Sequence, residues 1–169
     1  MKNKYKIAVI GLGYVGLPLA CLFSKKYSVH GYDVDENRVS QLRENYDKTN
    51  EISEQILVKQ QKGNLKITSS ILEIKDCNIF MVTVPTPVLE NKKPDLSFLM
   101  DASKDVSKLL KKGDIVIYES TVYPGCTEEV CVPILEKGSH LIYNKDFFCG
   151  YSPERINPGD KLHTVDKNK

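Results

Sequence analysis

A glycine-rich turn between a short apolar strand and a helix constrains this chain more than any other feature. The β-branched run Lys6–Ile10 leads straight into the sequence G-L-G-Y-V-G, and a helix is predicted over Pro18–Lys26. In such a turn Gly11 permits the tight bend, Gly13 lets the backbone approach a pyrophosphate, and Gly16 lets the helix pack close to the strand. The helix N-terminus adds free N–H donors and partial positive charge. The pattern therefore predicts a strand–turn–helix unit that binds a dinucleotide.

An acidic residue follows this turn at the spacing typical of NAD sites. Asp33 lies 22 residues after Gly11, at the end of a second predicted strand, Val29–Asp33. A carboxylate there can accept hydrogen bonds from the adenosine ribose and repels a 2′-phosphate, so NAD is favoured over NADP. The alternative is a glycine-rich turn beside a surface acid. Arg38 could flank the adenine of the same cofactor, or it could be an ordinary surface residue of the next helix.

The rest of the chain alternates between strands and helices, over a length that suits one domain spanning residues 1–169. Further strands are predicted over Leu65–Thr68, Ile79–Val84, Ile115–Tyr118 and Phe147–Tyr151. Helices are predicted over Glu36–Tyr46, over Ile52–Gln61, after a capping box at Ser70, from an N-cap at Asp95 to an end at Gly113, and over Thr127–Leu135. This order predicts an α/β domain of the Rossmann type, a doubly wound, mostly parallel sheet with helices on both faces.

Three further loops follow predicted strands and should meet the glycine turn at the carboxyl edge of the sheet, where ligands bind. The first contains Pro85 and Thr86, and the second offers the hydroxyls of Ser120 and Thr121 and continues to Thr127 at a helix start. The third places Glu154 beside Arg155, which could move a proton and hold a phosphate or carboxylate, or could form a solvated surface pair. Each loop taken alone could be ordinary turn chemistry.

Composition excludes several other classes of function. The 24 basic and 22 acidic residues leave a net charge of +2, with no basic stripe that would bind nucleic acid. The five cysteines and three histidines are scattered without metal-ligand spacing, which favours reduced, cytoplasmic cysteines and no metal site. The 17-residue uncharged run Ile7–Phe23 is short for a membrane span, and three glycines and Pro18 interrupt it, so neither a signal peptide nor membrane insertion is expected.

Four segments together resemble the UDP-glucose/GDP-mannose dehydrogenase family: Ile7–Pro18, Val82–Pro87, Glu119–Thr127 and Tyr151–Gly159. The last segment is closer to the branch that oxidises UDP-N-acetylhexosamines, because UDP-glucose dehydrogenases have a glutamate where this chain has Pro158. The resemblance implies oxidation of a sugar C6 alcohol to a carboxylate with two NAD⁺, in capsule or O-antigen synthesis. UDP-glucose or GDP-mannose as the substrate remains the alternative within the family.

The resemblance also implies roles for individual residues. NAD would be contacted by the glycine turn, with Tyr14 and Val15, and by Asp33, Pro85, Thr86, Ser120, Thr121 and Thr127. Thr121 and Glu154 would order a water and move protons as catalytic residues. Glu154, Arg155 and Ile156 would touch the UDP-sugar.

Other parts of the family pattern are not present in this chain. The family's covalent step needs a cysteine in a Cys-Phe-Pro-Lys-Asp segment, a lysine and an asparagine, and neither that segment nor the central helical region is found here. We therefore expect an NAD-binding domain that is inactive alone and whose parent enzyme is a homo-oligomer through a region missing here. The rival interpretations are a β-hydroxyacid or hydroxyacyl-CoA type dehydrogenase and a non-catalytic NAD-sensing module.

Overall fold

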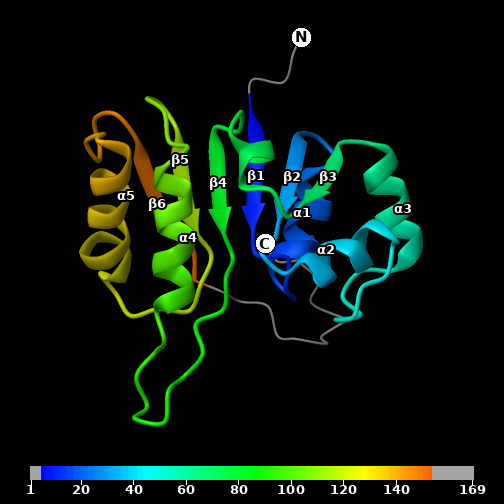
Figure 1. Cartoon of the computed structure of the whole chain (residues 1–169), viewed down its shortest axis with the longest axis horizontal. Helices are drawn as coiled ribbons and strands as arrows, with labels where there is room; N and C mark the ends of the chain where they lie inside the picture. The colour runs from blue at the N-terminus through cyan, green and yellow to red at the C-terminus, as the bar shows by residue number, and fades with distance from the viewer. Residues whose placement is uncertain (1–4, 154–169) are drawn as a thin grey trace.

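The computed structural model describes residues 5–153 and shows six parallel strands in a single sheet (Figure 1). The strands are β1 (Lys6–Ile10), β2 (Ser28–Tyr32), β3 (Leu65–Thr68), β4 (Ile79–Val82), β5 (Ile115–Tyr118) and β6 (Phe148–Tyr151). Their order across the sheet is β3-β2-β1-β4-β5-β6, and every pair is parallel. The order reverses between β1 and β4, which is where doubly wound sheets open a ligand crevice.

Helices cover both faces of this sheet (Figure 1). They are α1 (Gly16–Phe23), α2 (Glu36–Arg43), α3 (Glu54–Lys62), α4 (Ser97–Ser107) and α5 (Val132–Ser139), with a 3₁₀ turn η1 (Ile71–Ile74) and a π-helical turn η2 (Thr127–Cys131). Buried residues of α1, α2 and α3 pack in one core with Ile7 and Val9 of β1. Buried residues of α4 and α5 pack in a second core with Ala8 and Ile10. The predicted doubly wound α/β fold is confirmed.

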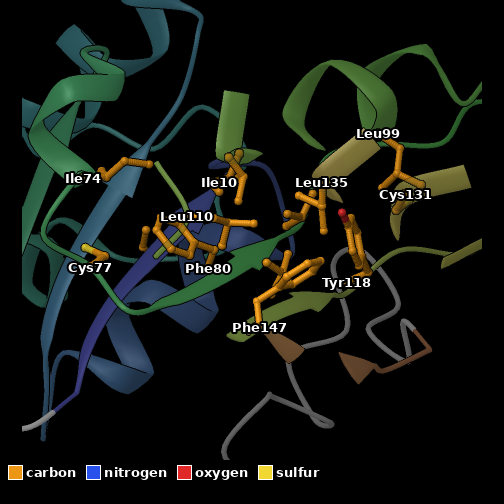
Figure 2. Packing of buried hydrophobic residues seen from close by; sticks show 14 of the residues in the cluster. Ile10, Ile74, Cys77, Phe80, Leu99, Leu110, Tyr118, Cys131, Leu135 and Phe147 are labelled. Carbon is orange, nitrogen blue, oxygen red and sulfur yellow. The ribbon is translucent and has the colours of Figure 1, made fainter. Parts of the chain in front are cut away.

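The two cores lie on opposite faces because successive residues of a strand point to opposite sides of a sheet. In the α4–α5 core, Phe80 and Tyr118 of neighbouring strands pack with Leu135 and Phe147, all fully buried (Figure 2). The Tyr118 hydroxyl lies 2.7 Å from the Ser103 hydroxyl of α4, so its polar end is satisfied inside the core.

Several predicted elements differ at their ends. α2 stops at Arg43 rather than Tyr46, because Asn45 adopts a left-handed φ of 65° that ends the helix. Ser70 makes no side-chain cap, and only a 3₁₀ turn follows it. Leu96 is the N-cap of α4, although the Asp95 carboxylate still accepts a 2.9 Å hydrogen bond from Ser97 N. The helix predicted from Thr127 begins as the π turn η2 before α5 continues to Ser139.

The uncharged run Ile7–Phe23 forms β1, the glycine turn and α1. Across residues 5–153, no helix combines the length and the apolarity that crossing a membrane requires.

Candidate functional site

A cavity of about 620 Å³ opens at the carboxyl edge of the sheet, next to the reversal between β1 and β4. Its walls come from the loops after β1, β2, β4 and β5, from α2 and the loop that follows it, and from one side of α4. Most of the predicted cofactor residues line it: Gly11, Gly13, Tyr14, Val15, Asp33, Arg38, Pro85, Thr86, Ser120 and Thr121. Residues far apart in the sequence thus meet at one site, as the topology of a parallel sheet requires.

The glycine turn has the backbone geometry that its sequence predicts. Gly11 has a φ of 90°, which L side chains rarely adopt, and its N–H donates to the Tyr32 carbonyl at 2.9 Å. A Cβ at Gly16 would overlap the Gly11 carbonyl oxygen and the hydroxyl of Thr83, so Gly16 allows α1 to pack against the turn without itself lining the cavity. A Cβ at Gly13 would meet nothing within 4 Å, so the backbone there is open to a ligand.

Thr83, just after β4, was not singled out from the sequence. Its buried hydroxyl donates to the Gly11 carbonyl oxygen at 2.7 Å and also lies 3.0 Å from the Ile10 carbonyl oxygen. Thr83 therefore holds the glycine turn against the neighbouring strand. The signal was weak, because a threonine at a strand end resembles any other β-branched residue.

The Asp33 carboxylate is already part of the site's framework. Its Oδ2 accepts a 2.7 Å hydrogen bond from Leu12 N, and its Oδ1 accepts one of 3.0 Å from Asp35 N. A carboxylate has about four lone-pair positions, so acceptor capacity remains for ribose hydroxyls. Asp33 thus fixes the glycine turn and faces the cavity at the same time.

Arg38 is not the surface helix residue that one interpretation of the sequence allowed. Its side chain is 4% exposed, its Nε donates to the Leu12 carbonyl at 2.9 Å, and its Nη2 lies 2.7 Å from Oδ1 of Asp47. Burial alone would raise the pKa of Asp47, but hydrogen bonds from Thr49 and Ile52 and from Arg38 lower it below its ordinary value. Asp47 belongs to no sequence motif and was not predicted as part of the site.

The loops after β4 and β5 are joined directly. The Thr86 hydroxyl donates to the Thr121 carbonyl at 2.9 Å, and the Ser120 hydroxyl donates to the Val84 carbonyl at 3.0 Å. These hydroxyls hold the two loops together at the cavity wall. Thr127, by contrast, is buried at the start of η2 and does not line the cavity.

One wall of the cavity comes from α4, a helix whose amphipathic sequence predicted only a role in the core. Phe98, Ala102 and Asp105 line the cavity from this helix, while Leu99 and Val106 are buried beneath it. The spacing of four and three residues places all three on one helix side, a signal available in the sequence. The predicted substrate residues Glu154, Arg155 and Ile156 lie outside the described residues.

Comparison with known proteins decides the family of this chain. Residues 5–169 match the model of the UDP-glucose/GDP-mannose dehydrogenase family, NAD binding domain. The chain belongs to that family. Its cofactor is accordingly NAD, and the β-hydroxyacid dehydrogenase interpretation is set aside.

Relatives within the UDP-glucose/GDP-mannose dehydrogenase family are close. The chain is 56% identical over 164 residues to a UDP-N-acetyl-D-glucosamine 6-dehydrogenase of Pseudomonas aeruginosa, covering 97% of this chain and 38% of that protein. It is 52% identical to protein CapL of Staphylococcus aureus, over 95% of this chain and 37% of that protein. The chain thus spans less than two fifths of the length of these relatives.

Solved structures of the family have the same fold. The UDP-D-ManNAc dehydrogenase of Pyrococcus horikoshii superposes with a TM-score of 0.85 at 36% identity, over 91% of this chain and 37% of that one. A GDP-mannose dehydrogenase ternary complex from Pseudomonas aeruginosa gives a TM-score of 0.82 at 26% identity, over 94% and 37%.

The residues present fit an NAD-binding domain of this family. The open backbone at Gly13 gives a diphosphate room to approach, and the buried Nη1 of Arg38 has no hydrogen-bond partner within residues 5–153. A buried donor without a partner costs free energy, so a polar ligand atom at this end of the cavity would satisfy it.

The five cysteines behave as buried apolar residues rather than as nucleophiles. All are free, and four are buried, while Cys149 is half-buried. Burial raises the pKa of the Cys21, Cys77 and Cys149 thiols to about 12 and that of Cys131 to about 11. Burial raises the pKa of Cys126 as well.

We expect the folded chain to resist alkylation. A thiol whose pKa rises from 9.0 to about 12 holds roughly a thousandfold less thiolate at pH 8, and only the thiolate attacks iodoacetamide. Mass spectrometry should find the cysteines unmodified in the folded chain. In about 6 M guanidinium, which unfolds the chain, it should find them fully modified. Fast modification of any one cysteine in the folded chain would contradict this assignment.

Proposed function

We propose that this chain forms the NAD-binding domain of a cytoplasmic UDP-N-acetylhexosamine 6-dehydrogenase that serves bacterial polysaccharide synthesis. The convergence of the glycine turn, Asp33 and Arg38 on one cavity carries the proposal for the cofactor. The 52–56% identity to a UDP-N-acetyl-D-glucosamine 6-dehydrogenase and to CapL supports the substrate class and the pathway. The free cysteines support a reducing compartment.

In this proposal different residues of the cavity contact different parts of the cofactor. The diphosphate lies over the backbone of Gly11 and Gly13, and Asp33 accepts hydrogen bonds from the adenosine ribose. Tyr14, Val15 and the joined loops of Thr86 and Ser120 border the rest of the cofactor. When bound, NAD⁺ supplies the acceptor for the hydride that leaves the sugar carbon.

We assign proton transfer to Thr121 and Glu154, and contacts with the UDP-sugar to Glu154, Arg155 and Ile156. Thr121 lines the cavity, and its carbonyl accepts a hydrogen bond from the Thr86 hydroxyl, which fixes its backbone at the cavity wall. The reaction also needs the cysteine, lysine and asparagine of the family pattern, so we attribute the complete oxidation, and the oligomeric state, to the whole protein.

Calorimetric titration of the 169-residue chain tests the cofactor assignment. We expect NAD⁺ to bind at one site per chain, and we expect UDP-N-acetylglucosamine added to the NAD⁺ complex to produce no NADH. Absence of NAD⁺ binding would contradict the cofactor assignment. NADH production by the chain alone would contradict the division of roles between this chain and the whole protein.

Steady-state kinetics of the whole protein test the substrate class. We expect kcat/KM to be higher for UDP-N-acetylglucosamine or UDP-N-acetylgalactosamine than for UDP-glucose and GDP-mannose. A preference for UDP-glucose or GDP-mannose would favour the alternative substrates of the family. Failure to oxidise any nucleotide sugar would favour the non-catalytic NAD-sensing module.

A further inference from the structure

The end of the cavity that holds Asp33 contains two contradictory signals for cofactor choice. Asp33 favours NAD, whereas an arginine near the same position is what accommodates the 2′-phosphate of NADP. Arg38 lines the cavity beside Asp33, and Lys48 does so as well. A free guanidinium here would attract a phosphate strongly, because arginine presents a planar fork of donors that suits phosphate oxygens. The cofactor preference therefore depends on whether the Arg38 guanidinium is already paired with another charged group.

The Arg38 guanidinium forms a buried ion pair with the carboxylate of Asp47. Oδ1 of Asp47 lies 2.7 Å from Nη2 of Arg38, and the two side chains are 1% and 4% exposed. Solvent screens a buried pair only weakly, so the attraction between the two charges is strong. Because the opposite charges lie side by side, they largely cancel at the position of a bound ligand. The Nε of Arg38 donates to the Leu12 carbonyl, which fixes the guanidinium against the glycine turn. Lys48 forms a weaker ion pair with Asp35, because its Nζ lies 3.6 Å from the Asp35 carboxylate and both side chains are about half exposed.

The loop that follows α2 holds the Asp47 carboxylate in place. Oδ1 accepts hydrogen bonds from the N–H and the hydroxyl of Thr49 at 3.0 and 2.7 Å. Oδ2 accepts from Glu51 N at 2.9 Å and from Ile52 N at 3.0 Å. The same carboxylate thus shapes the loop that brings Lys48 and Thr49 to the cavity wall. Because four hydrogen bonds from the loop hold the carboxylate, Asp47 cannot move away from Arg38 without breaking them.

We infer that Asp47 is a positioning residue that makes this site select NAD⁺ over NADP⁺, because its ion pair with Arg38 withholds the guanidinium charge from a 2′-phosphate. Asp33 repels the 2′-phosphate directly, and Asp47 removes the cation that would otherwise offset that repulsion. The buried Nη1 of Arg38, which has no partner among residues 5–153, remains able to donate to an uncharged oxygen or nitrogen of the adenosine. The inference rests on NAD⁺ binding at this cavity.

The test compares Kd for NAD⁺ and NADP⁺ in the 169-residue chain with Asp47→Asn. We expect the ratio of Kd for NADP⁺ to Kd for NAD⁺ to fall by about tenfold, because a released guanidinium can make a charged hydrogen bond to the 2′-phosphate. Adding Arg38→Gln to Asp47→Asn should restore the original ratio, since the gain acts through Arg38. A ratio within about twofold of the unaltered chain, or an equal gain in the double variant, would overturn the inference.

Thr49→Val is the matched control for damage to the loop. It removes the hydroxyl bond to Asp47 but leaves the ion pair with Arg38 in place. We expect any loss of affinity in this variant to affect both cofactors equally, so that the ratio stays unchanged. A shift of the ratio like that of Asp47→Asn would assign the effect to the loop and overturn the role of the charge.

Arginine side-chain ¹⁵N NMR of the unaltered chain keeps the inference testable if Asp47→Asn fails to fold. The chain has three arginines, and Arg38→Lys identifies the signals of Arg38. We expect separate, slowly exchanging Nη signals for Arg38 in the NAD⁺ complex, as for a guanidinium held by fixed partners. One averaged Nη signal would overturn the inference. Absence of NAD⁺ binding to the unaltered chain would instead contradict the proposed function.

Discussion

Replacing Gly16 with alanine should abolish measurable NAD⁺ binding and lower the free energy of unfolding by about 3 kcal/mol. The added Cβ would overlap the Gly11 carbonyl oxygen, which is backbone, and the Thr83 hydroxyl, which holds that carbonyl. Neither group can move without displacing β4 or the glycine turn. Thermal or urea unfolding measures the loss of stability, and calorimetry measures the loss of binding.

Gly13→Ala separates the two effects of the Gly16 substitution. A Cβ at Gly13 meets nothing within 4 Å in the protein, so we expect the stability to stay within about 1 kcal/mol while NAD⁺ affinity falls. Gly150→Ala is the control outside the cavity, because a Cβ at this position of β6 would have its nearest contact 3.8 Å away. A Gly16→Ala chain as stable as Gly150→Ala would contradict the packing role of Gly16.

Replacing Asp33 with alanine should weaken NAD⁺ binding by about a hundredfold, because it affects both the cofactor and the turn that holds it. In the proposed site the adenosine ribose loses its acceptor, and the N–H of Leu12, a residue that is 1% exposed, loses its 2.7 Å partner. An unpaired buried N–H costs about 1–3 kcal/mol, so stability should fall as well. Calorimetric titration with NAD⁺ measures the affinity.

Asp76→Ala is the control for removing a carboxylate. Its side chain is 70% exposed and lies 4.0 Å from Lys111, and it does not line the cavity. We expect this variant to bind NAD⁺ like the unaltered chain. Equal affinity in Asp33→Ala and Asp76→Ala would show that the adenosine ribose does not lie at Asp33.

The sequence predicted those parts of the site that depend on local backbone chemistry. The bend at Gly11 needs a positive φ and α1 needs the missing Cβ of Gly16, and both requirements are visible in the spacing of the glycines. The parallel topology then placed Thr86, Ser120 and Thr121 at the same edge, because strand ends of a doubly wound sheet meet there.

The parts that escaped prediction depend on contacts between segments without a shared motif. Asp47 lies in a loop, and nothing in its neighbourhood indicates that it pairs with Arg38 rather than with solvent. The hydrogen bond between Thr86 and the Thr121 carbonyl joins residues 35 positions apart. The π turn at Thr127 also has no sequence signature, and its geometry buries Thr127 outside the cavity.

The two cores on opposite faces of the sheet have a consequence for motion within the domain. The cavity takes its walls from both layers, with Arg38 of α2 on one side and Phe98 and Ala102 of α4 on the other. A ligand that contacts both layers must be released when either layer opens, so mass action makes both local unfolding reactions rarer. Fluctuations at the β3 and β6 edges of the sheet, which share no direct contact in the strand order, thereby become thermodynamically linked.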